Sequence, residues 1–338
     1  MERRLCIRYG WDLDLFTGKT GVAAYRGGSG AACLRHAHPL LWQQGSKIQA
    51  LRIAKWTRFG NSVIQLRNAL QLAEFLDVKI IEFGQPHPFF TAARVEPYEF
   101  VHVDRPPDRA TIEGSFFFVD AFRLRVDVTA RARLFTHYIR PLLTLDVSVA
   151  DPRVREEDLV LHFRAGDVFT GSKLHPAYGQ PPLSFYLAVV EREKPARVWL
   201  VFEDRGNPCI DSVEAALRER GIEVMLQCAT LAEDLRVLLS ARRLVASRGT
   251  FTHMIAHLSK RLQYVYFFDR GDVFEQADIE VFRACGVGVV SVEDAKGEFK
   301  DRVLAHWTGS SEQRALMLTY PAENLAFADR HQPERLIE

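Results

Sequence analysis

Several classes of protein are excluded by what this sequence lacks. It holds 5 cysteines among 338 residues, widely scattered and never in a CxxC pair, so it indicates neither a disulfide framework nor a zinc site. No run of apolar residues approaches the roughly 18 that a membrane-spanning helix needs. The formal net charge is only +1, whereas binding to nucleic acid needs a basic face. We therefore expect no nucleic-acid partner and no membrane span.

The N-terminal sequence also differs from that of a secretory signal peptide. Its basic residues are followed by Asp12 and Asp14, where a signal peptide has an apolar segment. We therefore expect a protein of the reducing cytoplasm.

Length and composition predict two ordinary globular domains. A chain of 338 residues exceeds what one hydrophobic core usually supports, and its 47% hydrophobic residues can fill two cores. The charged segment ADPRVREED, residues 150–158, has almost no apolar side chain to bury and is typical of a linker. We predict an irregular lead-in over residues 1–46, a first domain over 47–150 and a second over 151–338.

Strand and helix patterns alternate in both predicted domains. In the first, KIQALRIAKW predicts a strand, residues 61–78 carry apolar side chains at helical spacing, and VKIIEF predicts a buried strand. SFFFVD at 115–120 predicts a further strand, and ARARLFTHYIRPLL a helix. In the second, the alternation begins with LVLHF and runs to VGVVSV, with Thr230 and Glu233 as a capping box. Short apolar strands between helices are typical of parallel sheets, so we predict the α/β class with two Rossmann-like domains.

One unusual loop is HFRAGD, residues 162–167, directly after a predicted strand. Ligands of open α/β sheets bind outside the carboxyl ends of the strands. The guanidinium of Arg164 offers a planar fork of donors that fits two diphosphate oxygens, and Gly166 lets the backbone approach a ligand. Asp167 lies beside this cation, where it can serve catalysis or orient the arginine. A purely structural ion pair between Arg164 and Asp167 is the alternative.

A second unusual loop is SRGTF, residues 247–251, between a predicted strand and a short helix. Ser247, Gly249, Thr250 and the N–H groups of the helix can wrap a phosphate, because helix N-termini attract anions. The alternative is that Thr250 or Thr252 simply caps the helix.

Two further loops follow predicted strands. In RFGN, residues 58–61, we expect Asn61 at the N-cap of the helix, with Gly60 permitting close approach to a ligand. In FEDRGNP, residues 202–208, Glu203 and Asp204 can accept hydrogen bonds from a purine amino group or ribose hydroxyls. A capping residue and a solvated turn are the alternative interpretations of these two loops.

The pattern His-x-Arg-x-Gly-Asp after an apolar strand resembles the hallmark of the fucosyltransferases that make α1,2, α1,6 and protein O-linked bonds. RFGN, HPAYGQPPLSFY, the strand ending in FED, and SRGTF resemble further parts of these enzymes in the same order. A common form of the family has two basic residues inside the arginine motif, whereas here Phe163 and Ala165 flank the arginine. That departure bears on linkage and acceptor more than on fold.

The resemblance implies a GT-B fold, in which two Rossmann-like domains face each other across a cleft. It also implies GDP-fucose as co-substrate, inversion at the anomeric carbon, and no metal or other cofactor. Arg164 would bind the β-phosphate and stabilise the charge on the departing diphosphate. The other implied donor contacts are His162, Asn61, Gly60, Glu203, Asp204, Ser247, Gly249, Thr250 and Phe251. The acceptor would be a carbohydrate in surface polysaccharide or glycan synthesis, and a peripheral membrane contact through a lipid-linked acceptor stays open.

The acceptor hydroxyl needs a base in reach or a water relay to one, and Asp167 and His175 are the candidates. We favour Asp167, because His175 can instead be a structural residue of its loop or an acceptor contact. His253 and His257 lie four residues apart on one predicted helix, but without an HExxH pattern they indicate core or surface positions rather than a metal site.

Two rival functions stay open at this stage. The first is a GT-B glycosyltransferase that uses another donor, such as a CMP-linked or UDP-linked sugar. The second is a carbohydrate-binding protein that keeps the fold without catalysis.

Overall fold

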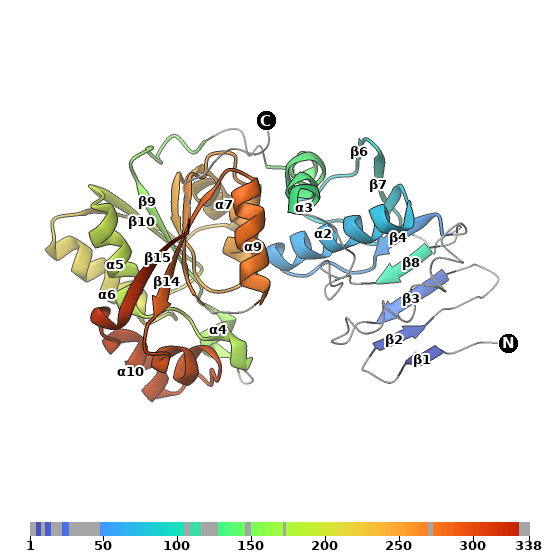
Figure 1. Cartoon of the computed structure of the whole chain (residues 1–338). Coiled ribbons are helices and arrows are strands. Elements are labelled where there is room, and N and C mark those ends of the chain that lie inside the picture. Colours follow the sequence, from blue (N-terminus) through green and yellow to red (C-terminus); the bar gives the residue numbers. More distant parts are fainter. Residues whose placement is uncertain are drawn as a thin grey trace. The chain divides into compact units, whose positions relative to one another are not determined.

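The computed structural model describes residues 5–7, 11–14, 22–26, 48–104, 109, 111–114, 116, 128–145, 150–171, 174–269 and 273–330. Contacts within the chain divide it into two compact units, Met1–Asp146 and Val147–Glu338, so the division falls a few residues before the predicted one. Figure 1 shows that each unit is built around its own β-sheet. No helix in these described ranges is both long enough and apolar enough to cross a membrane.

The first unit holds a sheet in the order β1-β2-β3-β8-β4-β5-β7-β6. Its central strands from β3 to β7 pair in parallel, and the strands at both edges pair antiparallel. The strands are β1 (Leu5–Ile7), β2 (Trp11–Asp14), β3 (Val22–Arg26), β4 (Ala50–Ile53), β5 (Ile80–Phe83), β6 (Ala93–Val95), β7 (Tyr98–His102) and β8 (Thr111–Gly114). The helical segments are α2 (Phe59–Leu76), α3 (Val128–Arg133), η1 (Leu134–Ile139) and η2 (Arg140–Leu142).

Helix α2 forms because apolar side chains recur on the face that packs on β4 and β5. Val63, Leu66 and Leu70 are fully buried there. The helix ends at Asp77, whose left-handed backbone (φ 54°) lets its N–H bond the carbonyls of the last turn.

Two predicted segments of this unit are the lead-in over 1–46 and the strand at 115–120. The expected irregular lead-in over 1–46 is wrong where β1, β2 and β3 lie, because strands of three to five residues are too short to show a clear period in the sequence. The strand expected at 115–120 lies outside the described residues except for Phe116, which belongs to no strand or helix.

The second unit holds a sheet in the order β11-β10-β9-β12-β13-β14-β15. All its pairs are parallel except that of β15 with β14. The strands are β9 (Leu159–Phe163), β10 (Arg197–Phe202), β11 (Glu223–Gln227), β12 (Arg243–Val245), β13 (Tyr264–Phe268), β14 (Gly288–Asp294) and β15 (Leu325–Arg330). Counted from β9, the six parallel strands follow the Rossmann order 3-2-1-4-5-6.

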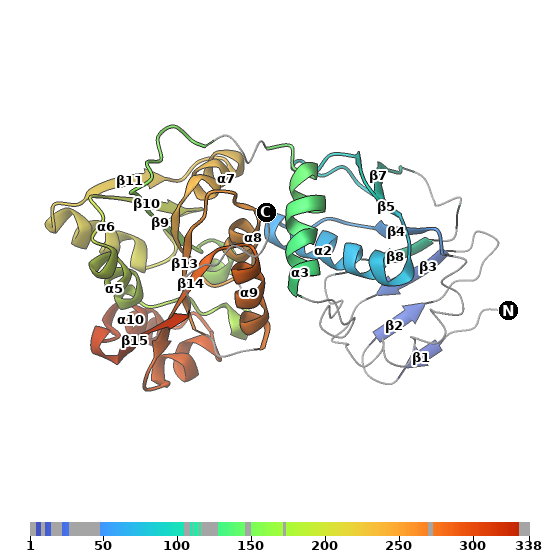
Figure 2. The ribbon, with the colours of Figure 1, turned by 45° about the horizontal axis from the view of Figure 1, so that its top comes forward.

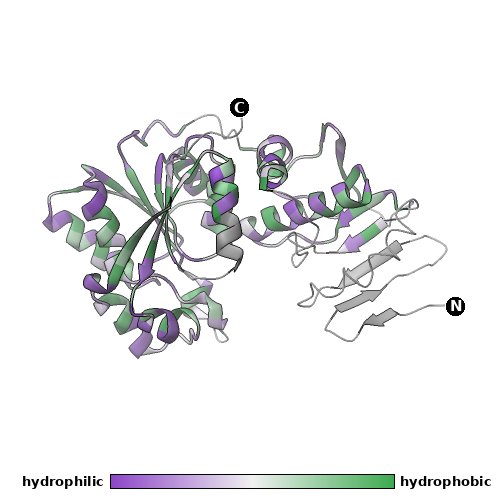
Figure 3. Cartoon of the chain, in the orientation of Figure 1, coloured by the Kyte–Doolittle hydropathy of each residue, from purple (hydrophilic) through white to green (hydrophobic). Residues whose placement is uncertain are grey.

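Helices cover both faces of this sheet, as Figure 2 shows, with α5, α6 and α10 on one face and α7, α8 and α9 on the other. They are α4 (Asp167–Thr170), α5 (Leu183–Glu193), α6 (Cys209–Glu219), α7 (Leu231–Ser240), α8 (Thr250–Leu258), α9 (Val273–Ala284) and α10 (Ser311–Thr319), with shorter turns η3 (Pro176–Tyr178), η4 (Lys300–Leu304) and η5 (Ala322–Asn324). Apolar residues dominate the strands between these layers (Figure 3). The predicted α/β class with two parallel-dominated sheets is therefore confirmed.

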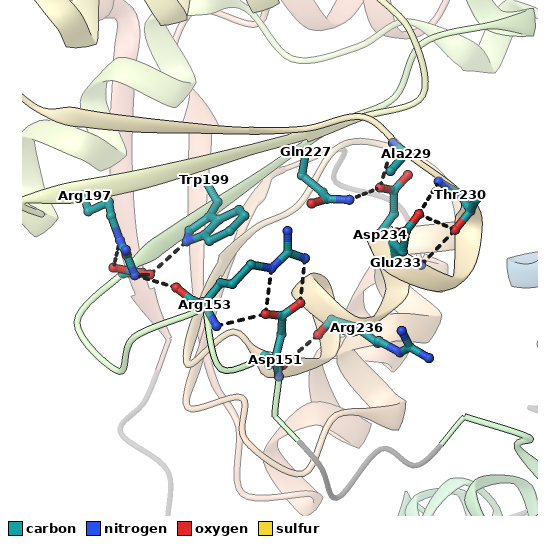
Figure 4. Close-up of polar contacts among 12 residues, drawn as sticks. Asp151, Arg153, Arg197, Trp199, Gln227, Ala229, Thr230, Glu233, Asp234 and Arg236 are labelled. Atoms are coloured by element: carbon teal, nitrogen blue, oxygen red, sulfur yellow. Dashed lines mark hydrogen bonds and ion pairs between the residues drawn. The ribbon is translucent and has the colours of Figure 1, made fainter.

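The segment 150–158 is part of the second unit, so its interpretation as a linker is wrong. Its Asp158 is 1% exposed and accepts hydrogen bonds from Nε of Arg197 at 2.9 Å and Nε1 of Trp199 at 2.8 Å. Burial opposes the charge of this carboxylate, but the hydrogen bonds outweigh burial and lower the pKa of Asp158. Asp151 is likewise buried and paired with Arg153 at 2.7 Å (Figure 4). Asp151 and Asp158 are buried in this otherwise largely exposed segment because each carboxylate has a cationic partner.

One predicted helix start is confirmed in this unit, and one helix end has a clear cause. Thr230 accepts a hydrogen bond from the N–H of Glu233, and Glu233 accepts one from the N–H of Thr230, which is the capping box at the start of α7 (Figure 4). Gly221 follows α6 with φ +70°, a backbone conformation that favours glycine.

Candidate active site

The two unusual loops meet where the strand order of the second unit reverses. β9 lies between β10 and β12, so the chain leaves β9 toward one side of the sheet and later returns on its other side. This is the topological switch point, outside which α/β proteins bind their ligands. HFRAGD, the arginine loop (162–167), follows β9, and the SRGTF loop (247–251) follows β12. Pairing of these two strands brings together motifs that are far apart in sequence.

Arg164 lies between the two loops. Its Nη2 donates to Oδ1 of Asp167 at 3.0 Å, and its guanidinium lies 6.0 Å from the ring centre of Tyr178. A methyl group added to Gly249 of the SRGTF loop would lie 3.7 Å from Nη1 of the arginine. The side chain is 18% exposed, and its Nε has no hydrogen-bond partner within the described part of the chain. Arg164 can therefore receive an anion at this edge.

The start of α8 provides a second anion-binding feature. Gly249 occupies the N-cap with φ +134°, and no side chain caps the helix. Thr250 is the first helical residue, so the alternative that Thr250 or Thr252 caps α8 is wrong. The uncapped N-terminus of this nine-residue helix carries a partial positive charge next to Arg164.

The side chain of His162, near the end of strand β9 and just before Arg164, connects the arginine loop to the SRGTF loop and the start of α8. Its Nδ1 lies 2.6 Å from Oγ of Ser247 and 2.5 Å from Oγ1 of Thr252, and the two hydroxyls are 3.2 Å apart. Burial, with a smaller contribution from the charge of Arg164, lowers the pKa of His162 to about 3, so the ring is neutral. The ring of Phe251 lies 5.2 Å from the imidazole. Thr252 entered the sequence interpretation only as a possible cap.

The loop after β10 supports the arginine loop. Oδ1 of Asp204 accepts hydrogen bonds from the N–H of Gly166 at 3.3 Å and of Gly206 at 2.7 Å. Nδ2 of Asn207 donates to the carbonyl of Arg164 at 3.0 Å. Gly166 has φ +62°, and a methyl group there would lie 2.7 Å from Oε2 of Glu203. Glu203 and Asp204 are thus at the predicted strand end and exposed, while the contact of Asn207 could not be inferred from its place in a turn.

The HPAYGQPP segment forms one side of the site. His175 is exposed, and its Nδ1 accepts the N–H of Ala177 at 3.1 Å, which caps η3. Its ring centre lies 5.1 Å from that of Tyr178, which is 40% exposed. The structural role considered for His175 is therefore present in the fold.

Gln180 fastens this segment to the SRGTF loop. Its Oε1 accepts the N–H of Arg248 at 3.2 Å, and its Nε2 donates to the carbonyl of Arg248 at 3.2 Å. Nη1 of Arg248 donates in turn to the carbonyls of Gly179 at 3.3 Å and Leu304 at 2.7 Å. No sequence pattern predicts these contacts, because a glutamine in a loop has many possible partners.

In the first unit the helix begins earlier than predicted. Arg58 is the N-cap of α2 and makes no side-chain cap, so the placement of Asn61 at the N-cap is wrong. Asn61 is the third helical residue, and Gly60 is buried in the first turn. The reason is Ser62, whose Oγ accepts the N–H of Thr57 at 3.2 Å and donates to its carbonyl at 3.0 Å. These bonds tie Thr57, which precedes the N-cap, to the first turns of the helix.

The histidines of α8 belong to the core. His253 lies 4.5 Å from the ring of Phe267, and His257 stacks 4.0 Å from Phe282. Searching the described side chains finds no group of three or more His, Cys, Asp or Glu residues that could hold a metal ion.

No protein-family model matches the chain, and no curated protein matches it. Solved structures do resemble it. POFUT1 in complex with GDP is 12% identical over 65% of this chain and 98% of that chain, with a TM-score of 0.39. FUT1 of Arabidopsis thaliana in complex with GDP is 10% identical over 73% and 76%, with a TM-score of 0.44. The heptosyltransferase WaaC of E. coli with ADP is 12% identical over 70% and 90%, with a TM-score of 0.35. At these scores the likeness assigns no function.

Proposed function

We propose that this chain is an inverting, metal-independent glycosyltransferase of the GT-B class that transfers fucose from GDP-fucose to a carbohydrate acceptor. The observation that supports this most is the meeting of Arg164 with the uncapped start of α8 at the switch point of a Rossmann sheet. Surface polysaccharides or glycans made in the cytoplasm are the acceptors that we propose.

The donor diphosphate would bind between Arg164 and the N-terminus of α8. When the bond between the anomeric carbon and the β-phosphate oxygen breaks, negative charge grows on the departing diphosphate. A guanidinium and oriented backbone N–H groups stabilise such charge without needing to reorganise, and one such donor typically contributes 10²- to 10³-fold in rate. This arrangement supplies, from the protein itself, the stabilisation that a divalent cation gives elsewhere.

The nucleoside would lie over the loop after β10. Glu203 is exposed there, beside Gly166 of the arginine loop. A carboxylate can accept two adjacent N–H donors, N1–H and the N2 amino group, on the pairing edge of guanine. Uracil has a single N–H donor on that edge, and in cytosine the amino group lies next to an acceptor nitrogen. The position of Glu203 therefore favours a guanine nucleotide.

Asp167 is the proposed base. Its side chain is 39% exposed and lies at the same edge as the guanidinium. A phosphate bound to Arg164 would compete with Asp167 for the guanidinium and leave the carboxylate able to accept a proton. In the reaction the acceptor oxygen bonds to the anomeric carbon, GDP leaves with the electron pair of the broken bond, and the proton passes to Asp167.

A calorimetric titration with GDP, GDP-fucose, UDP and CMP in the presence of a chelator tests base, sugar and metal dependence together. We expect GDP and GDP-fucose to bind without metal and GDP-fucose to be turned over. Preference for UDP or CMP would refute the guanine assignment, and a requirement for added cation would refute metal independence. A protein that binds a glycan but none of these nucleotides would instead be the carbohydrate-binding protein considered above.

A further inference from the structure

We propose that His162 is a positioning residue that acts through the hydroxyl groups of Ser247 and Thr252 to hold the SRGTF loop and the start of α8 against the strand that carries Arg164. This role replaces the direct donor contact that the family resemblance implies for His162. It rests on the proposed function, because it concerns the geometry of the same nucleotide site.

The pleat of β9 decides where His162 points. Phe163 stacks on Tyr186 of α5 with ring centres 4.3 Å apart, so it faces the α5 side of the sheet. Neighbouring residues of a strand point to opposite faces. His162 therefore faces the side that α8 covers, where its ring lies 5.2 Å from that of Phe251.

One ring nitrogen bridges both sides of Gly249. Ser247 precedes this glycine and Thr252 lies in the first turn of α8, and both hydroxyls reach Nδ1 of His162 within 2.6 Å. Gly249 itself has φ +134°, which other residues rarely adopt. Because glycine adopts many backbone conformations at little cost, the two anchors on either side of Gly249 are what select this one.

Burial commits the three polar groups to one another. His162 is 6% exposed, Ser247 2% and Thr252 0%. Buried polar groups without partners are costly, so these hydroxyls are engaged with the imidazole and with each other. The hydroxyls of Ser247 and Thr252 thus fix the direction of the first turn of α8.

The charge of the ring agrees with a positional role. Burial lowers the pKa of His162 to about 3, so a neutral imidazole lies beneath the site near pH 7. A neutral ring adds no positive charge to attract the diphosphate. Its effect on the donor must therefore pass through the loop that it holds.

The test compares two replacements of the imidazole. His162→Phe keeps a planar ring but removes Nδ1, and His162→Asn places an amide close to the position of Nδ1. We expect His162→Phe to weaken GDP binding at least tenfold in calorimetry and His162→Asn to recover most of the loss. The matched control is His306→Phe, an exposed histidine of the same unit, which should leave GDP binding unchanged.

A double-mutant cycle separates positioning from direct contact. If His162 acts through Thr252, the double variant His162→Phe/Thr252→Val should bind GDP within about twofold of His162→Phe alone, because the shared contact is already lost. The inference would be overturned if the losses of GDP affinity caused by His162→Phe and Thr252→Val multiplied in the double variant. Unchanged GDP affinity in His162→Phe would overturn it as well. Should that variant not fold, Ser247→Ala and Thr252→Val decide in its place, and wild-type affinity in both would be equally decisive against positioning.

Failure of the proposed function gives a different pattern. Wild-type protein that binds none of GDP, UDP and CMP would refute the nucleotide site, and the positioning role with it. Wild-type protein that binds GDP while every variant matches it would refute the positioning role alone.

Discussion

Nη2 of Arg164 donates to Oδ1 of Asp167 at 3.0 Å, and both side chains keep contact with solvent, 18% and 39% exposed. This ion pair is therefore neither fully buried in the core nor fully exposed to solvent. It holds the guanidinium at the switch point while a ligand can still reach it. This relationship leads to two predictions about turnover.

Replacing Arg164 by Ala should lower turnover of GDP-fucose by about 10²- to 10³-fold, since a donor to the departing diphosphate is lost. The turnover of Arg164→Lys should lie between those of the wild type and Arg164→Ala, because an ammonium keeps the charge without the planar fork. Steady-state kinetics measure turnover, and a thermal unfolding scan measures stability. Arg218→Ala, which removes an exposed arginine paired with Glu214, is the control and should change neither. Full activity in Arg164→Ala would rule out its phosphate role.

Replacing Asp167 by Asn should lower kcat by about 10²-fold or more while GDP still binds as tightly as before. The amide cannot accept the acceptor proton, but it leaves Arg164 available to the diphosphate. Comparing kcat with the dissociation constant of GDP makes the distinction. A larger loss of kcat in His175→Gln than in Asp167→Asn would show that the base is His175.

Gly166→Ala should destabilise the protein more than Gly221→Ala does. Both glycines have positive φ, but Gly166 combines φ +62° with ψ −126°, a backbone conformation that residues other than glycine rarely adopt. Only at Gly166 would the new methyl group also lie 2.7 Å from Oε2 of Glu203, whereas nothing lies within 4 Å of it at Gly221. Urea unfolding of both variants measures the difference. Adding Glu203→Ala to Gly166→Ala should remove only the part of the cost that comes from the contact with Glu203, and an unchanged cost would contradict a steric contribution.

Asp158→Asn should destabilise the second unit by about 3–5 kcal/mol, because it leaves the buried guanidinium of Arg197 without its counter-charge. The folded-state pKa of Asp158 is lowered, so its contribution to stability is present above its ordinary pKa of 3.8 and is lost as the pH falls through the folded value. Urea unfolding between pH 7 and pH 3 checks both effects. A stability equal to that of the wild type at pH 7 would mean that the pair contributes nothing.

His162 should make the protein less stable in mild acid. Its pKa is about 3 when folded and about 6.5 when unfolded, so the unfolded chain binds the extra proton first. Stability from this group is complete above pH 6.5 and falls by about 1.4 kcal/mol per pH unit between 6.5 and 3. His162→Phe should flatten the stability profile over this range relative to His306→Phe, and parallel profiles would contradict a buried neutral imidazole.

Sequence patterns located the elements of the second unit well, because each has a local cause. The strand LVLHF lies at Leu159–Phe163 as predicted, and the capping box of Thr230 with Glu233 marks the start of α7. Local patterns failed where a tertiary partner changed the outcome. The segment that contains Asp158 was predicted to be a linker, but Arg197 and Trp199 hydrogen-bond that carboxylate in the second unit, and α2 begins at Phe59 rather than after Asn61.

The sequence by itself determined that an arginine, a glycine and a carboxylate directly follow an apolar strand, which is the pattern from which we predict an anion site. Only the tertiary structure decided that the arginine loop and the SRGTF loop meet, because parallel pairing of β9 with β12 joins segments that no local pattern relates. It also decided that the hydroxyls of Ser247 and Thr252 turn to His162 rather than outward. The physical reason is burial: a hydroxyl removed from water bonds the nearest polar group, and which group is nearest depends on the folded chain.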